Sequence, residues 1–140
     1  MNEEATVHPV NSVAAAVLSI YVPGAPVPCA RARVFTKSGS GEIGASSTHR
    51  TAAYEKHVKI HAQIAANQAR WKCADALYVV WIDVYRAANR GDVDNYFKAL
   101  TDPMRGVVYP DDRMIVEAHV YLYVDRDHPC AKIRVEKKLT

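Results

Sequence analysis

Residues 77–85, Leu77-Tyr-Val-Val-Trp-Ile-Asp-Val-Tyr85, are the stretch around which this chain is organised. They are rich in Val, Ile, Trp and Tyr, which favour extended structure because their side chains pack well on a pleated surface. The stretch therefore predicts a central strand. A basic turn, Arg86-Ala-Ala-Asn-Arg-Gly91, ends it. The segment from Asp92 to about Arg105 then predicts a short helix that an aspartate caps and Gly106 ends.

Two more strands are predicted downstream of this helix. From Ile115 to Val124, apolar and polar residues alternate with the period of a strand. One face would carry Val116, Ala118, Val120, Leu122 and Val124, and the other Glu117, His119, Tyr121 and Tyr123. A turn at 125–129 leads to the last strand, 131–137, in which Ile133 and Val135 face inward.

Upstream, a first strand is predicted from Leu18 to Val22, and a helix from Thr48 or Thr51 to about Arg70. The buried side of this helix is predicted to hold Tyr54, Val58, Ile64 and several alanines. This order of elements predicts an α+β fold: a single domain with a mixed β-sheet of about four or five strands and two main helices. We place the domain at 15–140 and a flexible N-terminal tail at 1–14.

The composition agrees with one globular domain, since the 140 residues are 49% hydrophobic and 24% charged. Three cysteines, Cys29, Cys73 and Cys130, lie too far apart to suggest a disulfide framework or a zinc motif, and we expect reduced thiols in a cytoplasmic protein. The apolar run 13–22 is too short to span a membrane and has no basic residue before it, so neither a membrane segment nor a signal peptide is expected.

Charge is distributed unevenly along the chain. From Pro23 to Lys72, eight basic residues stand against two acidic ones, whereas from Cys73 to Thr140 ten basic residues stand against eleven acidic ones. The first part can supply a positive surface for a polyanion, and the second holds a cluster of acids. Within a long connection rich in Pro, Gly and Ser, Arg31, Arg33 and Lys37 would project to one side of an extended segment.

The acidic cluster points to metal chemistry. Asp92 and Asp94 flank a single residue at the junction of strand and helix, so in extended backbone their carboxylates converge. Like charges this close repel unless a cation lies between them, and Mg²⁺ or Mn²⁺ suits such oxygen ligands. A second pair, Asp111 and Asp112, precedes the long strand. If the sheet brings the two junctions together, three or four carboxylates meet at one edge.

Lys98 lies four residues after Asp94, and Asp102 four after Lys98, so a helix places all three on one face. In a metal-assisted cleavage of a phosphodiester, the lysine would add positive charge at the scissile phosphate, and Asn95 would orient a carboxylate or a metal-bound water. The alternative is a surface salt-bridge ladder with one aspartate as helix cap. That alternative leaves the second acidic pair without a role.

These motifs carry a family resemblance. The segment 92–98, Asp-Val-Asp-Asn-Tyr-Phe-Lys, followed by Asp102 and by 106–112, Gly-Val-Val-Tyr-Pro-Asp-Asp, resembles the RusA family of Holliday junction resolvases, small endonucleases common in phages and prophages. The loop 26–33 and the helix start 51–55, Thr-Ala-Ala-Tyr-Glu, are also similar to that family. The resemblance extends from about Ile20 to Val135.

The resemblance implies a homodimer that binds four-way DNA junctions and nicks two opposed strands with Mg²⁺, for which Mn²⁺ can substitute, in DNA recombination and repair. It makes Asp92, Asp94 and Asp112 catalytic metal ligands and Lys98 a catalytic lysine, with Asp111 as a close neighbour and with Asn95 and Asp102 in support. The expected DNA contacts are Arg31, Arg33, Lys37, Arg50 and Arg90.

Two positions depart from the family's pattern. Pro103 stands where a helix former is expected, and it should shorten or kink the helix. Met114 stands where a polar residue is commoner. Two other functions therefore stay open beside a junction resolvase: a non-catalytic nucleic-acid-binding module of the same fold, and a metal-dependent nuclease that acts on flaps or single strands.

Overall fold

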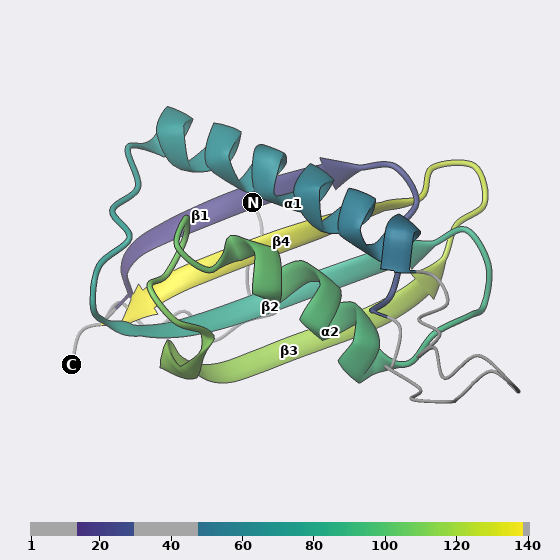
Figure 1. The fold of residues 1–140 in the computed structure, drawn as a ribbon. Helices are drawn as coiled ribbons and strands as arrows, with labels where there is room; N and C mark the ends of the chain where they lie inside the picture. The colour runs from purple at the N-terminus through teal and green to yellow at the C-terminus, as the bar shows by residue number, and fades with distance from the viewer. Residues whose placement is uncertain (1–13, 30–47, 139–140) are drawn as a thin grey trace, which may run out of the picture.

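The computed structural model describes residues 14–29 and 48–138, in which two helices lie on one face of a four-stranded sheet (Figure 1). The elements in chain order are β1 (Ala14–Pro23), α1 (Thr48–Ala69), β2 (Leu77–Arg86), α2 (Val93–Thr101), the 3₁₀ turns η2 (Asp102–Met104) and η3 (Asp112–Met114), β3 (Ile115–Val124) and β4 (Cys130–Lys138). The α+β class, the mixed sheet and the two main helices are confirmed.

The sheet has the order β1-β4-β2-β3. Strand β4 is antiparallel to both of its neighbours, whereas β2 and β3 are parallel, with Tyr78 paired to Ile115 and Arg86 to Val124. The position of β2 between two strands confirms the predicted central strand. Because parallel strands cannot be joined by a tight turn, a crossover must carry the chain back from the end of β2 to the start of β3. Helix α2 lies in that crossover (Figure 1).

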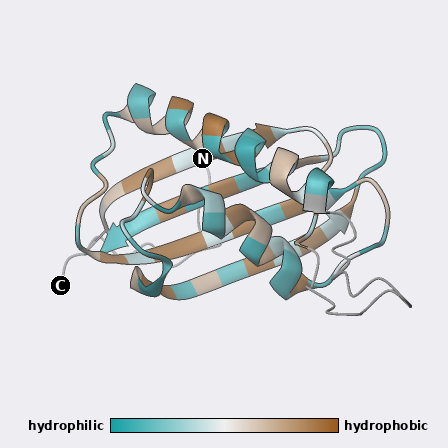
Figure 2. Cartoon of the chain, viewed as in Figure 1, coloured by the Kyte–Doolittle hydropathy of each residue, from teal (hydrophilic) through white to brown (hydrophobic). Residues whose placement is uncertain are grey.

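The core lies between the helices and the sheet. Strand residues that face the helices are buried, and Figure 2 shows the resulting alternation of hydrophobic and hydrophilic positions along the strands; the buried strand residues are Leu18, Ile20, Val22, Tyr78, Val80, Ile82, Val84, Ala131, Ile133 and Val135. On the edge strand β3, Val120 and Leu122 are half-buried against this core, whereas Val116 and Val124 are exposed.

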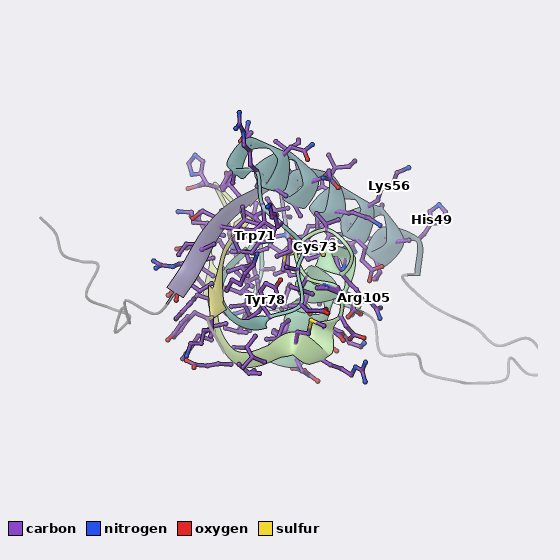
Figure 3. All side chains as sticks on the ribbon, turned by 90° about the vertical axis from the view of Figure 1, so that its left-hand side faces the viewer. His49, Lys56, Trp71, Cys73, Tyr78 and Arg105 are labelled. Atoms are coloured by element: carbon purple, nitrogen blue, oxygen red, sulfur yellow. The ribbon has the colours of Figure 1, made fainter. Side chains whose placement is uncertain are left out.

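At the end of the molecule that faces the viewer in Figure 3, aromatic rings fill the space between the helix layer and the sheet. The rings of Trp71 and Tyr78 lie 6.4 Å apart between centroids, and the indole Nε1 of Trp71 donates a hydrogen bond to the carbonyl of Val108 at 2.8 Å. On the outer side of α1, His49 and Lys56 project away from the sheet (Figure 3).

The buried side of α1 is narrower than predicted. Tyr54, Val58, Ala62 and Ala66 repeat every four residues and are all buried. Ile64 is 46% exposed, so its predicted burial is wrong. The reason is geometric: Ile64 stands two residues from both Ala62 and Ala66, which on a helix puts it on the opposite side from that row.

Helix α2 is shorter than the predicted segment, in the way that Pro103 predicts. The α-helical part ends at Thr101, and the chain continues as the 3₁₀ turn η2 with Pro103 in its first positions. Gly106 follows with φ of +84°, a left-handed conformation that stops the helix. The buried Tyr109 closes this corner, since its hydroxyl donates to the carbonyl of Thr101 at 2.7 Å.

Two isoleucines test this account of the core. We expect Ile82→Ala, at a fully buried position of β2, to lower the free energy of unfolding by about 2–5 kcal/mol, because it leaves a cavity. The matched change Ile64→Ala should stay within about 0.5 kcal/mol of the wild type, because that side chain is half exposed. Chemical denaturation of the full chain measures both, and equal losses would contradict the observed packing of α1.

Candidate active site

The first pair of predicted site residues lies at the start of α2. Asp92 occupies the N-cap position with extended backbone (φ −95°, ψ 160°), but its side chain makes no capping hydrogen bond. Asp94 lies in the first turn of the helix, and both residues are exposed. The carboxylate of Asp92 is therefore not used for capping, and the pair faces solvent where the positive end of the helix dipole favours negative charge.

Two buried side chains hold the loop that presents Asp92. Arg86, only 9% exposed at the end of β2, directs its guanidinium to the carbonyls of Tyr123 (3.3 Å), Arg90 (3.4 Å) and Gly91 (3.4 Å). The hydroxyl of Tyr96, in the second turn of α2, donates to the carbonyl of Arg90 at 2.7 Å. The loop is thus fixed to β2, β3 and α2 at once. Neither Arg86 nor Tyr96 was predicted as a site residue, because a hydrogen-bonding role toward a distant loop leaves no mark in local spacing.

Position 91 requires glycine for two reasons, its backbone conformation and the close packing around it. Its φ is +89°, and a Cβ at this position would come within 2.7 Å of Cε2 of Tyr96 and 3.0 Å of Cγ of Pro28. The residue lets the chain turn into α2 directly against the Tyr96 ring. A larger residue would push that ring and the loop apart and so displace Asp92.

A second glycine in the same chain separates the effect of this close contact from the effect of backbone conformation. Gly106 has a similar φ of +84°, but a Cβ there would meet no atom within 4 Å. We expect Gly106→Ala to cost about 1–2 kcal/mol of stability from backbone strain alone, and Gly91→Ala to cost at least about 1 kcal/mol more, because it adds the steric clash. Thermal and denaturant unfolding measure the difference. Equal costs would mean that the Tyr96 ring yields freely.

Lys98 forms the ion pair with Asp102 that their spacing predicts. The Lys98 Nζ lies 3.2 Å from Oδ2 of Asp102, and the lysine side chain is 64% exposed. The hydrogen bond and charge of Asp102 raise the pKa of Lys98 above its usual range, with smaller contributions from Cys29 and Asp112. The ammonium therefore stays charged at neutral pH.

The second acidic pair is held at η3. The side chain of Asp111 accepts hydrogen bonds from the backbone N–H of Arg113 at 3.0 Å and from its Nε at 3.3 Å. The backbone N–H of Arg113, acting with the neighbouring Asp112, lowers the pKa of Asp111. Asp111 is therefore the cap of this short turn, while the adjacent Asp112 is half-buried.

The topology does not bring the two acidic pairs together within one chain. Since β2 and β3 are parallel, the start of β3 lies beside the start of β2, and Asp112 precedes it there. Asp92 and Asp94 instead follow the end of β2. Helix α2, whose nine residues rise about 14 Å, and the turns η2 and η3 lie between the two pairs along the chain. The condition for a shared site of three or four carboxylates is not met in the single chain.

Another set of ligand atoms does converge. Among the described residues, the His, Cys, Asp and Glu side chains that group with all ligand atoms within 4.8 Å are Cys29, Glu55 and Asp102. The Cys29 thiol lies 3.6 Å from Oε2 of Glu55, and its pKa is raised by burial first and by Glu55 second. A neutral thiol donates to the carboxylate here, so the three residues tie the 26–29 loop, α1 and the end of α2 together beside Lys98.

A hollow of about 420 Å³ lies next to the Asp92 loop. Its walls come from the 25–29 segment, from the 87–90 turn and from Tyr96, and both Arg50 and Arg90 line it. The backbone N–H of Cys29 donates to the carbonyl of Asn95 at 3.0 Å and fixes one wall to α2. Two of the five predicted DNA contacts thus share one hollow. The other three, Arg31, Arg33 and Lys37, lie outside the described residues.

The fold and these side chains define a class: a single-domain α+β protein that presents acids, a lysine and arginines around a helix that crosses over between parallel strands. Comparison with protein families identifies it further. The family model for endodeoxyribonuclease RusA matches residues 23–136, and the chain belongs to this family. A comparison with curated proteins gave no match. None of the helices in the described parts of the chain is long and apolar enough to cross a membrane.

Proposed function

We propose that this chain is a Mg²⁺-dependent, structure-specific DNA endonuclease that resolves four-way junctions by paired nicks as a homodimer. The family match over 23–136 supplies the nuclease class. The observation that carries the proposal is the exposed pair Asp92 and Asp94 beside a hollow lined by Arg50 and Arg90. Acids that can hold a cation and arginines that can hold a phosphate stand next to one another, as cleavage of a phosphodiester requires.

The donor set fits Mg²⁺ in part. Magnesium commonly takes one or two protein carboxylates and completes its shell with water and substrate phosphate oxygens. Asp92 and Asp94 would hold it in this way. Asp112, which the RusA resemblance assigns to the same ion, instead precedes β3 at the far end of the crossover, where its charge helps to raise the pKa of Lys98. When bound, the ion would supply an acidified water and neutralise charge on the phosphate.

The chain's own residues supply the remaining steps. Arg50 and Arg90 bind the DNA backbone in the hollow, and Arg86 with Tyr96 fixes the loop that orients Asp92. Lys98 is held protonated by Asp102 and can exchange that carboxylate for a phosphate oxygen, since the pair is exposed and such pairs contribute little stability. The lysine then stabilises negative charge at the phosphate in the transition state.

The separation of the two acidic pairs favours one other function. If Asp112 never joins Asp92 and Asp94, the protein would be a non-catalytic module that binds branched DNA through its basic residues. Binding by such a module would weaken with salt, and no metal would produce cleavage. A cleavage assay separates the two functions.

The assay compares a synthetic four-way junction, a flap and a linear duplex, each with Mg²⁺, Mn²⁺ or EDTA. We expect metal-dependent paired nicks in the junction, and a loss of cleavage by Asp94→Asn of about 100-fold or more with junction binding retained, because a carboxylate that holds the ion is removed. Asp112→Asn measures separately whether the second pair takes part.

The matched control is Asp127→Asn, an exposed aspartate in the turn after β3. It should cleave like the wild type. Cleavage by Asp94→Asn at the wild-type rate would refute the metal site, and tight junction binding without any cleavage would establish the binding module. Equal cleavage of flap and junction would support the metal-dependent cleavage but contradict the proposed specificity for junctions.

The two arginines that line the hollow allow a prediction about DNA binding that does not depend on cleavage. We expect Arg50→Ala and Arg90→Ala each to weaken junction binding, and to reduce the slope of log K against log salt by about 1, because each removes one phosphate contact. Arg126→Ala, an exposed arginine in the 125–129 turn, is the control and should leave the slope unchanged. Fluorescence anisotropy over a salt series measures the slopes. Identical slopes for all variants would show that the hollow is not part of the DNA-binding surface.

A further inference from the structure

The half-buried group of Cys29, Glu55 and Asp102 brings a thiol and two carboxylates together, and the proposed cleavage does not account for that convergence. One ligand atom from each residue lies within 4.8 Å of the other two. The residues come from three places in the chain: Cys29 from the segment after β1, Glu55 from α1 and Asp102 from the start of η2. Because Cys29 and Glu55 alone stand 26 positions apart, no local spacing marks the group in the sequence.

The distance between two of these ligand atoms fits a tetrahedral Zn²⁺ ion. Zinc lies about 2.3 Å from a thiolate sulfur and about 2.1 Å from a carboxylate oxygen, so at a tetrahedral angle the two ligand atoms are about 3.6 Å apart. The sulfur of Cys29 and Oε2 of Glu55 lie 3.6 Å apart. Because the thiol donates to the carboxylate across the same distance, an ion can replace the thiol proton without moving either residue, and that proton passes to solvent.

The charges of the group also suit a cation. Among the described residues, Glu55 has the Cys29 thiol, a weak donor, as its hydrogen-bond partner and no lysine or arginine at ion-pair distance. Asp102 holds Lys98 through Oδ2 at 3.2 Å, and its other oxygen is available to a second cation. With the thiol deprotonated, the three ligands carry three negative charges, which Zn²⁺ and the adjoining ammonium of Lys98 balance together.

A buried hydroxyl next to the group has no partner. Oγ1 of Thr51 is buried and makes no hydrogen bond within the part of the chain that the structure describes. Thr51 precedes Glu55 by one turn of α1, so the two side chains are neighbours on the helix surface. Three protein ligands leave the fourth position of a tetrahedral zinc ion to water, and such a water would satisfy the hydroxyl, whose burial without a partner is costly.

The thiol decides which metal the group takes. Sulfur is a soft ligand that suits Zn²⁺, whereas Mg²⁺ is bound almost entirely through oxygen. A site that contains Cys29 therefore discriminates against the ion proposed for Asp92 and Asp94. An ion also has a path to the site, since Cys29 lines the hollow of about 420 Å³ that opens beside the Asp92 loop.

We propose that Cys29, Glu55 and Asp102 form a Zn²⁺ site, separate from the magnesium site proposed at Asp92 and Asp94. The ion joins the segment after β1 to α1 and to η2, and so stabilises one wall of the hollow that Arg50 and Arg90 line. The site does not depend on the proposed cleavage, because a protein that only binds DNA would contain the same three ligands.

The test is a titration of the metal-free full chain with Co²⁺, a spectroscopic substitute for Zn²⁺. Cobalt bound to a thiolate gives a charge-transfer band in the near ultraviolet, which carboxylate or imidazole ligands alone do not give. We expect the wild type to show this band. Added Zn²⁺ should abolish it, whereas about a 1000-fold excess of Mg²⁺ should leave it, because the thiolate selects against magnesium.

Cys29→Ser should abolish the band, and Cys73→Ser, which changes an exposed thiol, is the matched control and should keep it. Asp94→Asn should also keep the band, which separates this site from the proposed magnesium site. A wild type without the band would overturn the proposal, as would metal bound through other groups alone, such as His57 and His61. A Cys29→Ser variant with a band of wild-type strength would overturn it too.

A second variant keeps the proposal testable if Cys29→Ser fails to fold by circular dichroism. We expect Glu55→Gln to weaken Zn²⁺ binding, measured by displacement of Co²⁺, by at least about 10-fold, a loss typical even of groups that only support a metal ligand. Zinc at about 100 times its Kd should raise the Tm of the wild type by about 5–10 °C and that of Glu55→Gln by less. Wild-type affinity in Glu55→Gln would overturn the site.

Discussion

The parallel pairing of β2 with β3 is the constraint on which the rest of this structure depends. It forces a crossover from one end of the sheet to the other, and α2, η2 and η3 fill that crossover. Nearly every residue singled out for chemistry lies on it. The crossover also packs against the sheet face that α1 covers, so both described helices lie on the same side of the sheet. One choice of strand direction thus decides where the acids lie.

The start of the crossover is rigid because buried polar groups define it. Arg86 brings a buried charge to three carbonyl groups, and Tyr96 and Gly91 fit against each other at a distance no other residue would tolerate. A buried guanidinium without hydrogen-bond acceptors would be costly, so these carbonyls satisfy Arg86, and the same hydrogen bonds fix the path of the loop. The exposed Asp92 gains a defined position from groups that never contact a substrate.

Several features could be predicted from local pattern. The alternation in 115–124 gave the bounds of β3 as observed, and the helix and strand order was correct because each element carries its own periodicity. Pro103 ended the α-helical part of α2 because a proline ring acts on the backbone directly. The predicted burial of Ile64 was wrong, because hydrophobicity alone did not show that the smaller Ala62 and Ala66 would face the sheet instead.

The sequence by itself determined the types of residue available for catalysis and their spacing along the chain: the Asp92–Asp94 pair, the Lys98–Asp102 ladder and the Asp111–Asp112 pair, because these depend on residues a few positions apart. Only the tertiary structure decided which of them meet. Strand direction, a long-range property that no local spacing encodes, placed the two acidic pairs at opposite ends of the crossover. It also brought Cys29, Glu55 and Asp102 together from three separate segments, since contacts between distant residues form only when the sheet and helices pack.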